Sequence, residues 1–104
     1  MSAAQVNGYR LAPAARRDLQ AIWTYTAETW SVDQADRYLA LLTGAFERLA
    51  ENPHLARERT EFTPPVRVHA ITSHLVIYLV LADHVLIVRV RHQREDWMSN
   101  PVGS

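Results

Sequence analysis

The 104-residue chain contains no cysteine and no lysine, and it has three glycines. Without cysteine there are no disulfides, thiolate nucleophiles or cysteine-based metal sites, and we expect a cytosolic protein. Without lysine, no amine can act as a base or form a Schiff base. Three scattered glycines cannot form the glycine-rich loops of Walker or dinucleotide sites, and no Gly-x-Ser-x-Gly elbow exists. These absences exclude several large classes of enzyme.

Charge of one sign and long hydrophobic runs are also missing. Eleven arginines balance eleven acidic residues, so no global positive field exists of the kind that drives sequence-independent binding to nucleic acid. The longest apolar run, Leu75 to Ala82, is too short to cross a bilayer, and the first residues do not resemble an export signal. With 48% apolar residues, we expect one folded, soluble domain over residues 1–104.

Hydrophobic periodicity predicts a short strand followed by a helical hairpin. Tyr9–Leu11 alternates and stops before Pro13, which suits the first turn of a helix. Apolar residues then recur at spacings of three and four over residues 13–30, and Ser31 with Gln34 has the spacing of a capping box. A second, cleaner stripe ends at Asn52-Pro53. The core-facing residues expected on the first helix are Ala15, Leu19, Ile22, Trp23, Thr26 and Trp30, with Tyr25 off the stripe and exposed.

The last third of the chain changes to a strand-like pattern. Residues 54–65 read as a long loop, and then the segments 66–71, 74–82 and 85–91 are rich in Val, Ile and Leu and separated by two-residue turns. This spacing predicts an antiparallel meander of three strands. The fold class is therefore α+β, with a core of about 9–97 and a flexible C-terminal tail.

The final strand carries two different faces. If the apolar set Leu86, Val88 and Val90 packs on the helices, the alternate side chains point away from them. Those alternate side chains are Val85, Ile87, Arg89 and Arg91. Together with the outer half of the central strand they would expose a large apolar patch, which a partner chain would cover. The alternative is that the tail around Trp97 and Met98 folds back over this face as a lid.

Arginine is concentrated in the C-terminal half of the chain. Residues 57–94 contain six arginines against three acids, and His92 follows directly on the last strand. Such a group could stabilise a phosphate while the imidazole moves a proton, although for any single arginine a solvated ion pair is the better explanation. The histidines at 54, 69, 74, 84 and 92 lack metal-ligand spacing. We therefore expect neither metal nor cofactor.

Short motifs in a fixed order make residues 9–97 resemble the ParE branch of the RelE/ParE toxins of type II toxin–antitoxin modules. The motifs are Tyr9-x-Leu11, Ala15, Asp18-Leu19-x-x-Ile22-Trp23-x-Tyr25, Trp30, Gln34-Ala35-x-x-Tyr38, Leu49, Asn52-Pro53, Arg67, His74-x-x-Ile77-Tyr78 and Val88-Arg89-Val90-x-His92. The resemblance implies a helical hairpin packed on a small antiparallel sheet. It also implies a toxin that inhibits DNA gyrase without its own catalytic centre and forms a hetero-oligomer with a ParD-like antitoxin.

The other branch of that superfamily offers an alternative function. RelE relatives cut mRNA on the ribosome with lysines, arginines and a C-terminal Tyr or His, and this chain matches that set only through Arg67, Arg89 and His92. The missing lysines favour gyrase inhibition, with no membrane partner and no sequence-specific contact to nucleic acid. We assign the antitoxin to the face formed by Val85, Ile87, Arg89 and Arg91, and the target to Arg57, Arg59, His92, Arg94 and Trp97.

Overall fold

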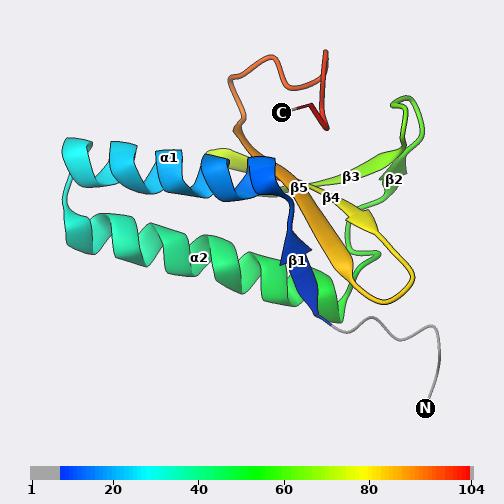
Figure 1. Ribbon diagram of the computed structural model, residues 1–104, viewed down its shortest axis with the longest axis horizontal. Coiled ribbons are helices and arrows are strands. Elements are labelled where there is room, and N and C mark those ends of the chain that lie inside the picture. Colours follow the sequence, from blue (N-terminus) through cyan, green and yellow to red (C-terminus); the bar gives the residue numbers. More distant parts are fainter. Residues whose placement is uncertain (1–7, 104) are drawn as a thin grey trace.

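The computed structural model describes residues 8–103, which form two helices and one five-stranded sheet (Figure 1). The predicted first strand, helical hairpin and three-stranded meander are confirmed. A two-residue strand, β2, also lies inside the segment expected to be a loop. The elements are β1 (Tyr9–Leu11), α1 (Pro13–Thr29), α2 (Val32–Glu51), β2 (Glu58–Arg59), β3 (Val66–Ile71), β4 (His74–Val80) and β5 (Val85–His92).

The helices begin and end at the residues whose chemistry favours it. Pro13 occupies the first helical position of α1, where its missing N–H costs nothing. The Ser31 hydroxyl accepts a 3.0 Å hydrogen bond from the backbone N–H of Gln34 and so caps α2. The Gln34 side chain bonds Arg37 at 3.3 Å, so the observed contacts form half of the predicted capping box. The link at Trp30 and Ser31 turns the chain back on itself, and the helices run side by side (Figure 1).

The sheet has the order β1-β5-β4-β3-β2 and is mixed in direction. The three long strands form the expected antiparallel meander, whereas β1 pairs with β5 in parallel, with Tyr9 opposite Val85. The wholly antiparallel sheet expected from the sequence is therefore corrected at this edge. Parallel pairing arises because α1 and the rest of the chain separate β1 from its partner, as a crossover connection requires.

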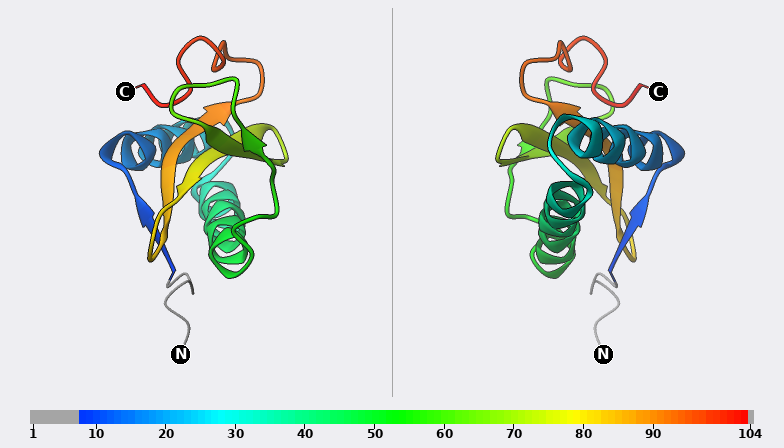
Figure 2. Two further views of the ribbon diagram at one scale, coloured as in Figure 1. Left: turned by 90° about the vertical axis from the view of Figure 1, so that its right-hand side faces the viewer. Right: turned by 90° about the vertical axis from the view of Figure 1, so that its left-hand side faces the viewer.

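Two apolar clusters lie on the two faces of the sheet, which runs between α2 and the C-terminal tail (Figure 2). The helix-side cluster joins Leu42, Phe46 and Leu49 to strand residues such as Tyr78. The outer cluster contains Val66, Ile77 and Trp97, all at most 5% exposed. The central strand β4 is therefore buried on both faces, as its continuous apolar sequence predicted. Among the described residues, no helix is long and apolar enough to cross a membrane.

A β-bulge reverses the predicted facing of the first half of β5. Tyr78 pairs with Ile87 while Ile77 pairs with Arg89, which leaves Val88 as an extra residue between them. Val85 and Ile87 are consequently 0% exposed in the helix-side cluster, and the prediction that they point outward is wrong. Arg89 and Arg91 lie opposite residues of the outer face, as predicted. Strict two-residue alternation fails here because the bulge changes its phase.

The outer end of the helical hairpin is more exposed than the apolar stripe predicted. Trp30 is 74% exposed, so its assignment to the core is wrong, whereas the predicted exposure of Tyr25, at 68%, is confirmed. The helices extend past the sheet at this end (Figure 1), so no strand lies beneath Trp30 to cover it. Trp23 is partly buried and donates a 2.9 Å bond from its indole N–H to Asp36.

Candidate functional site

Arg89 is fixed by α1 rather than presented to solvent. Its guanidinium donates two hydrogen bonds to the Asp18 carboxylate, at 2.7 and 2.8 Å, and a third to the carbonyl of Gly103. Asp18 also accepts the backbone N–H of Val90 at 2.9 Å, on the part of β5 that extends beyond its pairing with β1. The bond to Asp18 raises the pKa of Arg89. Both side chains are 14% exposed, so this pair joins α1, β5 and the C-terminal tail.

The end of β5 is held by Glu95. The Glu95 carboxylate accepts bonds from the Arg91 side chain at 2.9 Å and from the backbone N–H of His92 at 2.8 Å. Burial opposes ionisation of Glu95, but these bonds outweigh it and lower the pKa of the carboxyl group. The His92 Nδ1 atom accepts the backbone N–H of Arg94 at 3.1 Å, and the Arg94 side chain is exposed. Arg94 therefore places an exposed cation next to His92.

Arg67 belongs to a different part of the molecule. It donates a 2.6 Å bond to the carbonyl of Ala56, and it lies opposite Tyr78 on the helix side of the sheet. The Tyr78 hydroxyl, whose pKa burial raises, donates to the carbonyl of Pro53 and accepts from the backbone N–H of Ala56. Arg67 thus supports the loop after α2. Because Arg89 faces the other side of the sheet, the structure does not bring the three nuclease candidates together.

The C-terminal tail covers the outer face of the sheet. Trp97 is 5% exposed and its ring centroid lies 5.7 Å from that of Phe62. The Arg59 guanidinium lies over both rings, 5.3 Å from the Phe62 centroid and 5.4 Å from that of Trp97. The alternative in which the tail forms a lid is confirmed, and Val102 extends this packing beyond the expected limit at residue 97. In this arrangement Trp97 is not on the surface, whereas Arg57 is exposed.

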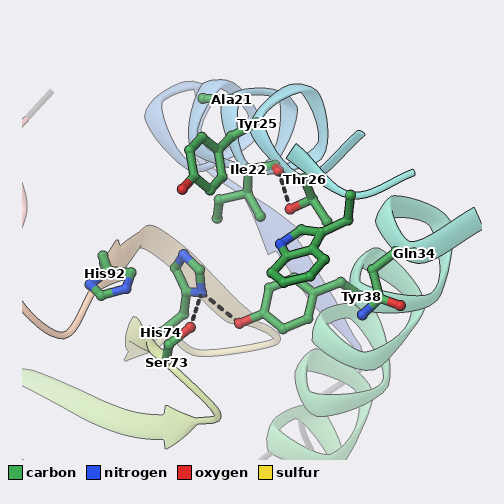
Figure 3. Close-up of a pocket in the computed structure, with 10 residues that line it drawn as sticks. Ala21, Ile22, Tyr25, Thr26, Gln34, Tyr38, Ser73, His74 and His92 are labelled. Atoms are coloured by element: carbon green, nitrogen blue, oxygen red, sulfur yellow. Dashed lines mark hydrogen bonds between the residues drawn. The ribbon is translucent and has the colours of Figure 1, made fainter. Parts of the chain in front are cut away.

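A cavity of about 450 Å³ opens between the helical hairpin and the β3–β4 turn, with Tyr25, Tyr38 and His74 directed into it (Figure 3). The Tyr38 hydroxyl lies 2.6 Å from His74 Nδ1 and 2.5 Å from Thr72 Oγ1. The rings of His74 and His92 meet edge to face, with their centroids 5.3 Å apart. Residues 36 positions apart form this site, which explains why local sequence patterns did not identify it.

Counting protons in this cluster fixes the tautomer of His74. The Thr72 hydroxyl donates to the carbonyl of Ile71 at 2.7 Å, so its oxygen can only accept from Tyr38. The Tyr38 hydroxyl donates its only proton to Thr72, so it accepts a hydrogen bond from His74. The chain of donors therefore runs from His74 Nδ1–H through Tyr38 to Thr72, and the neutral His74 ring keeps Nε2 as an acceptor. Thr72 has a φ of 49°, which the two-residue turn requires.

The half-buried His74 makes stability depend on pH. Burial, and next the nearby His92, lower the pKa of His74 below 6.5. The unfolded chain therefore binds a proton more readily, and the contribution of neutral His74 to stability is complete above pH 6.5 and falls as the pH drops towards the folded-state pKa. We expect His74→Gln, which cannot titrate, to lose less stability than the wild type between pH 7.5 and 5.5, measured as urea midpoints. His54→Gln, in an exposed loop, is the control and should behave like the wild type. Equal losses in His74→Gln and the wild type would contradict this linkage.

Among the residues that the structure describes, no three His, Cys, Asp or Glu side chains gather to hold a metal ion. The positively charged side chains predicted to act together divide into three settings. Arg89 and Arg91 are ion-paired at the end of β5, Arg59 lies on the aromatic rings under the tail, and Arg57 and Arg94 extend into solvent. This arrangement leaves exposed charge and exposed aromatic rings available for binding, and it places Arg67 and Arg89 on opposite sides of the sheet.

Comparison with known proteins places the chain among bacterial toxins. Residues 9–97 match the family model described as the ParE toxin of the type II toxin–antitoxin system parDE. The chain is 42% identical to Toxin ParE1 of Mycobacterium tuberculosis, a match over 85% of this chain and 91% of that protein. It is 39% identical to Toxin ParE1 of Caulobacter vibrioides, over 82% and 88%, and 32% identical to Toxin ParE of Escherichia coli, over 90% and 92%.

A solved structure shows the same fold. A chain of the structure titled "Chromosomal ParDE TA system from P. aeruginosa" superposes with a TM-score of 0.74 at 16% identity. The match covers 88% of this chain and 98% of that one. The overall fold is thus shared at low sequence identity.

Proposed function

Since the chain belongs to the ParE toxin family of type II toxin–antitoxin systems, we propose that it inhibits DNA gyrase in the cytosol and is neutralised by a ParD-like antitoxin. The observation that carries this proposal is the separation of Arg67, Arg89 and His92. Arg67 and Arg89 face opposite sides of the sheet and each holds a structural bond. This separation supports a toxin that acts by binding, not by catalysis.

The target surface that we propose extends from the end of β5 to the β2 edge of the sheet, and its two exposed cations lie at these separate places. Arg94 follows His92, and Arg57 adjoins β2. Arg59 and Trp97 support this surface from below, since their stacking holds the tail in place. Exposed charge of this kind accelerates encounter with a negatively charged partner, such as the gyrase–DNA complex.

The antitoxin surface that we propose is formed by Arg91 and the neighbouring Arg89. Val85 and Ile87 lie under the helices, so in this arrangement they contribute by shaping β5. Acidic side chains of an antitoxin would compete with Glu95 for the Arg91 guanidinium, which supplies a charge-assisted contact. The gene adjacent to this one should encode a small ribbon-helix-helix protein.

The direct test is a supercoiling assay with purified gyrase, ATP and relaxed plasmid. We expect the toxin to stop supercoiling and to accumulate cleaved DNA, and the adjacent antitoxin to restore activity. The double variant with Arg57→Glu and Arg94→Glu should require a roughly tenfold higher concentration than the wild type for the same inhibition, because it reverses exposed charge at the target surface. The matched control is Arg10→Glu, which changes an exposed arginine on β1. Undiminished supercoiling without cleaved DNA, even with excess toxin, would count against gyrase as the target.

The second candidate function is a ribosome-dependent mRNA endonuclease that uses Arg67, Arg89 and His92. The observation that favours it is the position of His92 beside the exposed Arg94. That function requires His92 to move a proton, so His92→Ala would abolish toxicity and transcripts would be cut in translating extracts. Gyrase inhibition instead expects intact transcripts and toxicity of His92→Ala within about threefold of the wild type, as for loss of one surface contact.

A further inference from the structure

Of the residues that line the cavity beside His74, only His92 belongs to the contacts proposed for gyrase or antitoxin. It is lined by two α1 residues, Ile22 and Tyr25, by Trp30 and Tyr38 of the hairpin, and by His74 and His92 of the sheet. Its volume of about 450 Å³ lies within the range of small-molecule sites, roughly 300–1,000 Å³. The rings come from five different elements or links, so the fold, not local sequence, assembles the cavity.

The walls of the cavity are aromatic rings that the rest of the chain leaves uncovered. Trp30 is 74% exposed and Tyr25 is 68% exposed, although both are large apolar side chains. Tyr25 is directed towards the space above His74 (Figure 3). Exposed rings around a hollow provide flat surfaces on which a planar heteroaromatic ring can stack. A flat, aromatic ligand therefore fits these walls better than an aliphatic one.

The floor of the cavity offers one hydrogen-bond acceptor and one donor. His74 donates from Nδ1 to Tyr38, which leaves its Nε2 as an acceptor. His92 accepts the Arg94 N–H at Nδ1, so in the neutral ring the proton lies on Nε2. Nucleobases carry both donors and acceptors on their edges. The two imidazoles can therefore bond a base that is stacked on the aromatic walls.

Two arginines adjoin residues that line the cavity. Arg94 is bonded through its backbone to His92, and the Arg37 side chain is bonded to Gln34, which also lines the cavity. Neither arginine takes part in an ion pair among the described residues, whereas the neighbouring Glu95 is occupied by Arg91. An aromatic cavity with free cations adjoining its lining discriminates against a cationic ligand, for which aromatic rings alone would be suitable.

We propose that this cavity binds a nucleotide, with its base stacked on Tyr25 and Trp30 and its phosphate directed to Arg94 or Arg37. The ligand chemistry is the same for a free nucleotide and for an unpaired nucleotide of single-stranded DNA. Recognition by stacking needs none of the glycine-rich loops that the sequence lacks, and it needs no net positive charge on the whole chain. This site shares Arg94 with the proposed target surface, but binding of a nucleotide is measured without gyrase, so either proposal can fail while the other holds.

The test uses the indole N–H signals of the three tryptophans in NMR spectra of the ¹⁵N-labelled chain. Adenosine 5′-monophosphate and a short oligodeoxyadenylate are added separately, with adenosine and inorganic phosphate as partial ligands. We expect the Trp30 signal to shift while that of Trp97, which the tail buries against the sheet, stays fixed. Adenosine should bind roughly fivefold more weakly than the monophosphate, because it lacks the charged group that the arginines contact. A stronger shift with the oligomer identifies a DNA strand as the source, and a stronger shift with the monophosphate identifies a free nucleotide.

Surface variants separate this site from general binding. Tyr25→Ala should weaken binding of the monophosphate roughly tenfold, as for the loss of one stacking ring. Arg94→Gln should remove the difference in affinity between the monophosphate and adenosine. Leu55→Ala, another exposed apolar residue, should change nothing. The proposal is overturned if millimolar monophosphate and oligomer leave Trp30 unmoved, if phosphate alone shifts it equally, or if Tyr25→Ala binds like the wild type.

Discussion

Replacing Asp18 with alanine is expected to lower the free energy of unfolding by about 3 kcal/mol, because it breaks a largely buried ion pair. The variant leaves the Arg89 guanidinium 14% exposed without its carboxylate partner, and it also removes the acceptor of the Val90 N–H. A buried donor or charge left without a partner costs its full desolvation. Urea unfolding monitored by tryptophan fluorescence measures the loss.

Two further variants assign this loss to its parts. Asp18→Asn keeps an oxygen for Val90 and removes the charge, so its loss should lie between those of the wild type and the alanine variant. Glu28→Ala, an exposed acid on the same helix, should change stability by less than about 0.5 kcal/mol. If the free energies of unfolding of Asp18→Ala and Glu28→Ala differ by less than that margin, the Asp18–Arg89 ion pair does not join α1 to β5 in solution.

Replacing Trp97 with alanine is expected to have a similarly large effect, about 3 kcal/mol, because a large buried aromatic ring is lost. Its removal uncovers Ile77 and Val66 and separates Arg59 from one of the two rings over which it lies. Trp97→Phe should recover roughly half of that loss, since much of the apolar area remains. Thermal and urea unfolding of the purified chain provide the measurement.

The neighbouring Met98 provides the matched control for the tail. It is 57% exposed, so Met98→Ala should cost less than about 0.5 kcal/mol. Similar values for the two positions would show that the tail is not held on the sheet. Because Trp97 supports the proposed target surface, Trp97→Ala should also reduce gyrase inhibition in folded samples at low temperature, whereas Met98→Ala should not.

The sequence predicted the two helices and the strands β3 to β5 well, because each is long enough to show a hydrophobic period of its own. The stripe on α2 and its cap at Ser31 defined both ends of the helix, and the two-residue turns defined β3 to β5. The strand β2 was missed because two residues, Glu58 and Arg59, cannot show any alternation. The parallel pairing of β1 was not predictable either, since it depends on where α1 returns the chain.

The candidate site was predicted less well, and the bulge at Val88 is the main reason. A bulge is defined by the register with a neighbouring strand, so nothing in residues 85–91 alone reveals that the phase changes after Ile87. The pairing of Arg89 with Asp18 also joins positions 71 residues apart. Tyr38 and His74 appeared among the family motifs, and this shared membership was the one available signal that they belong to a common site.

The parallel contact between β1 and β5 has a consequence for how the toxin is made. Tyr9 leaves the ribosome well before its partner, Val85, so the sheet cannot close on the first part of the nascent chain. Until β5 emerges, the helical hairpin also lacks Ile87 and Val90 from its apolar cluster. In topologies of this kind, contacts between residues far apart in the sequence form late in folding, because closing a long loop costs entropy. The toxin domain therefore completes its sheet only after residues 85–92 have left the ribosome.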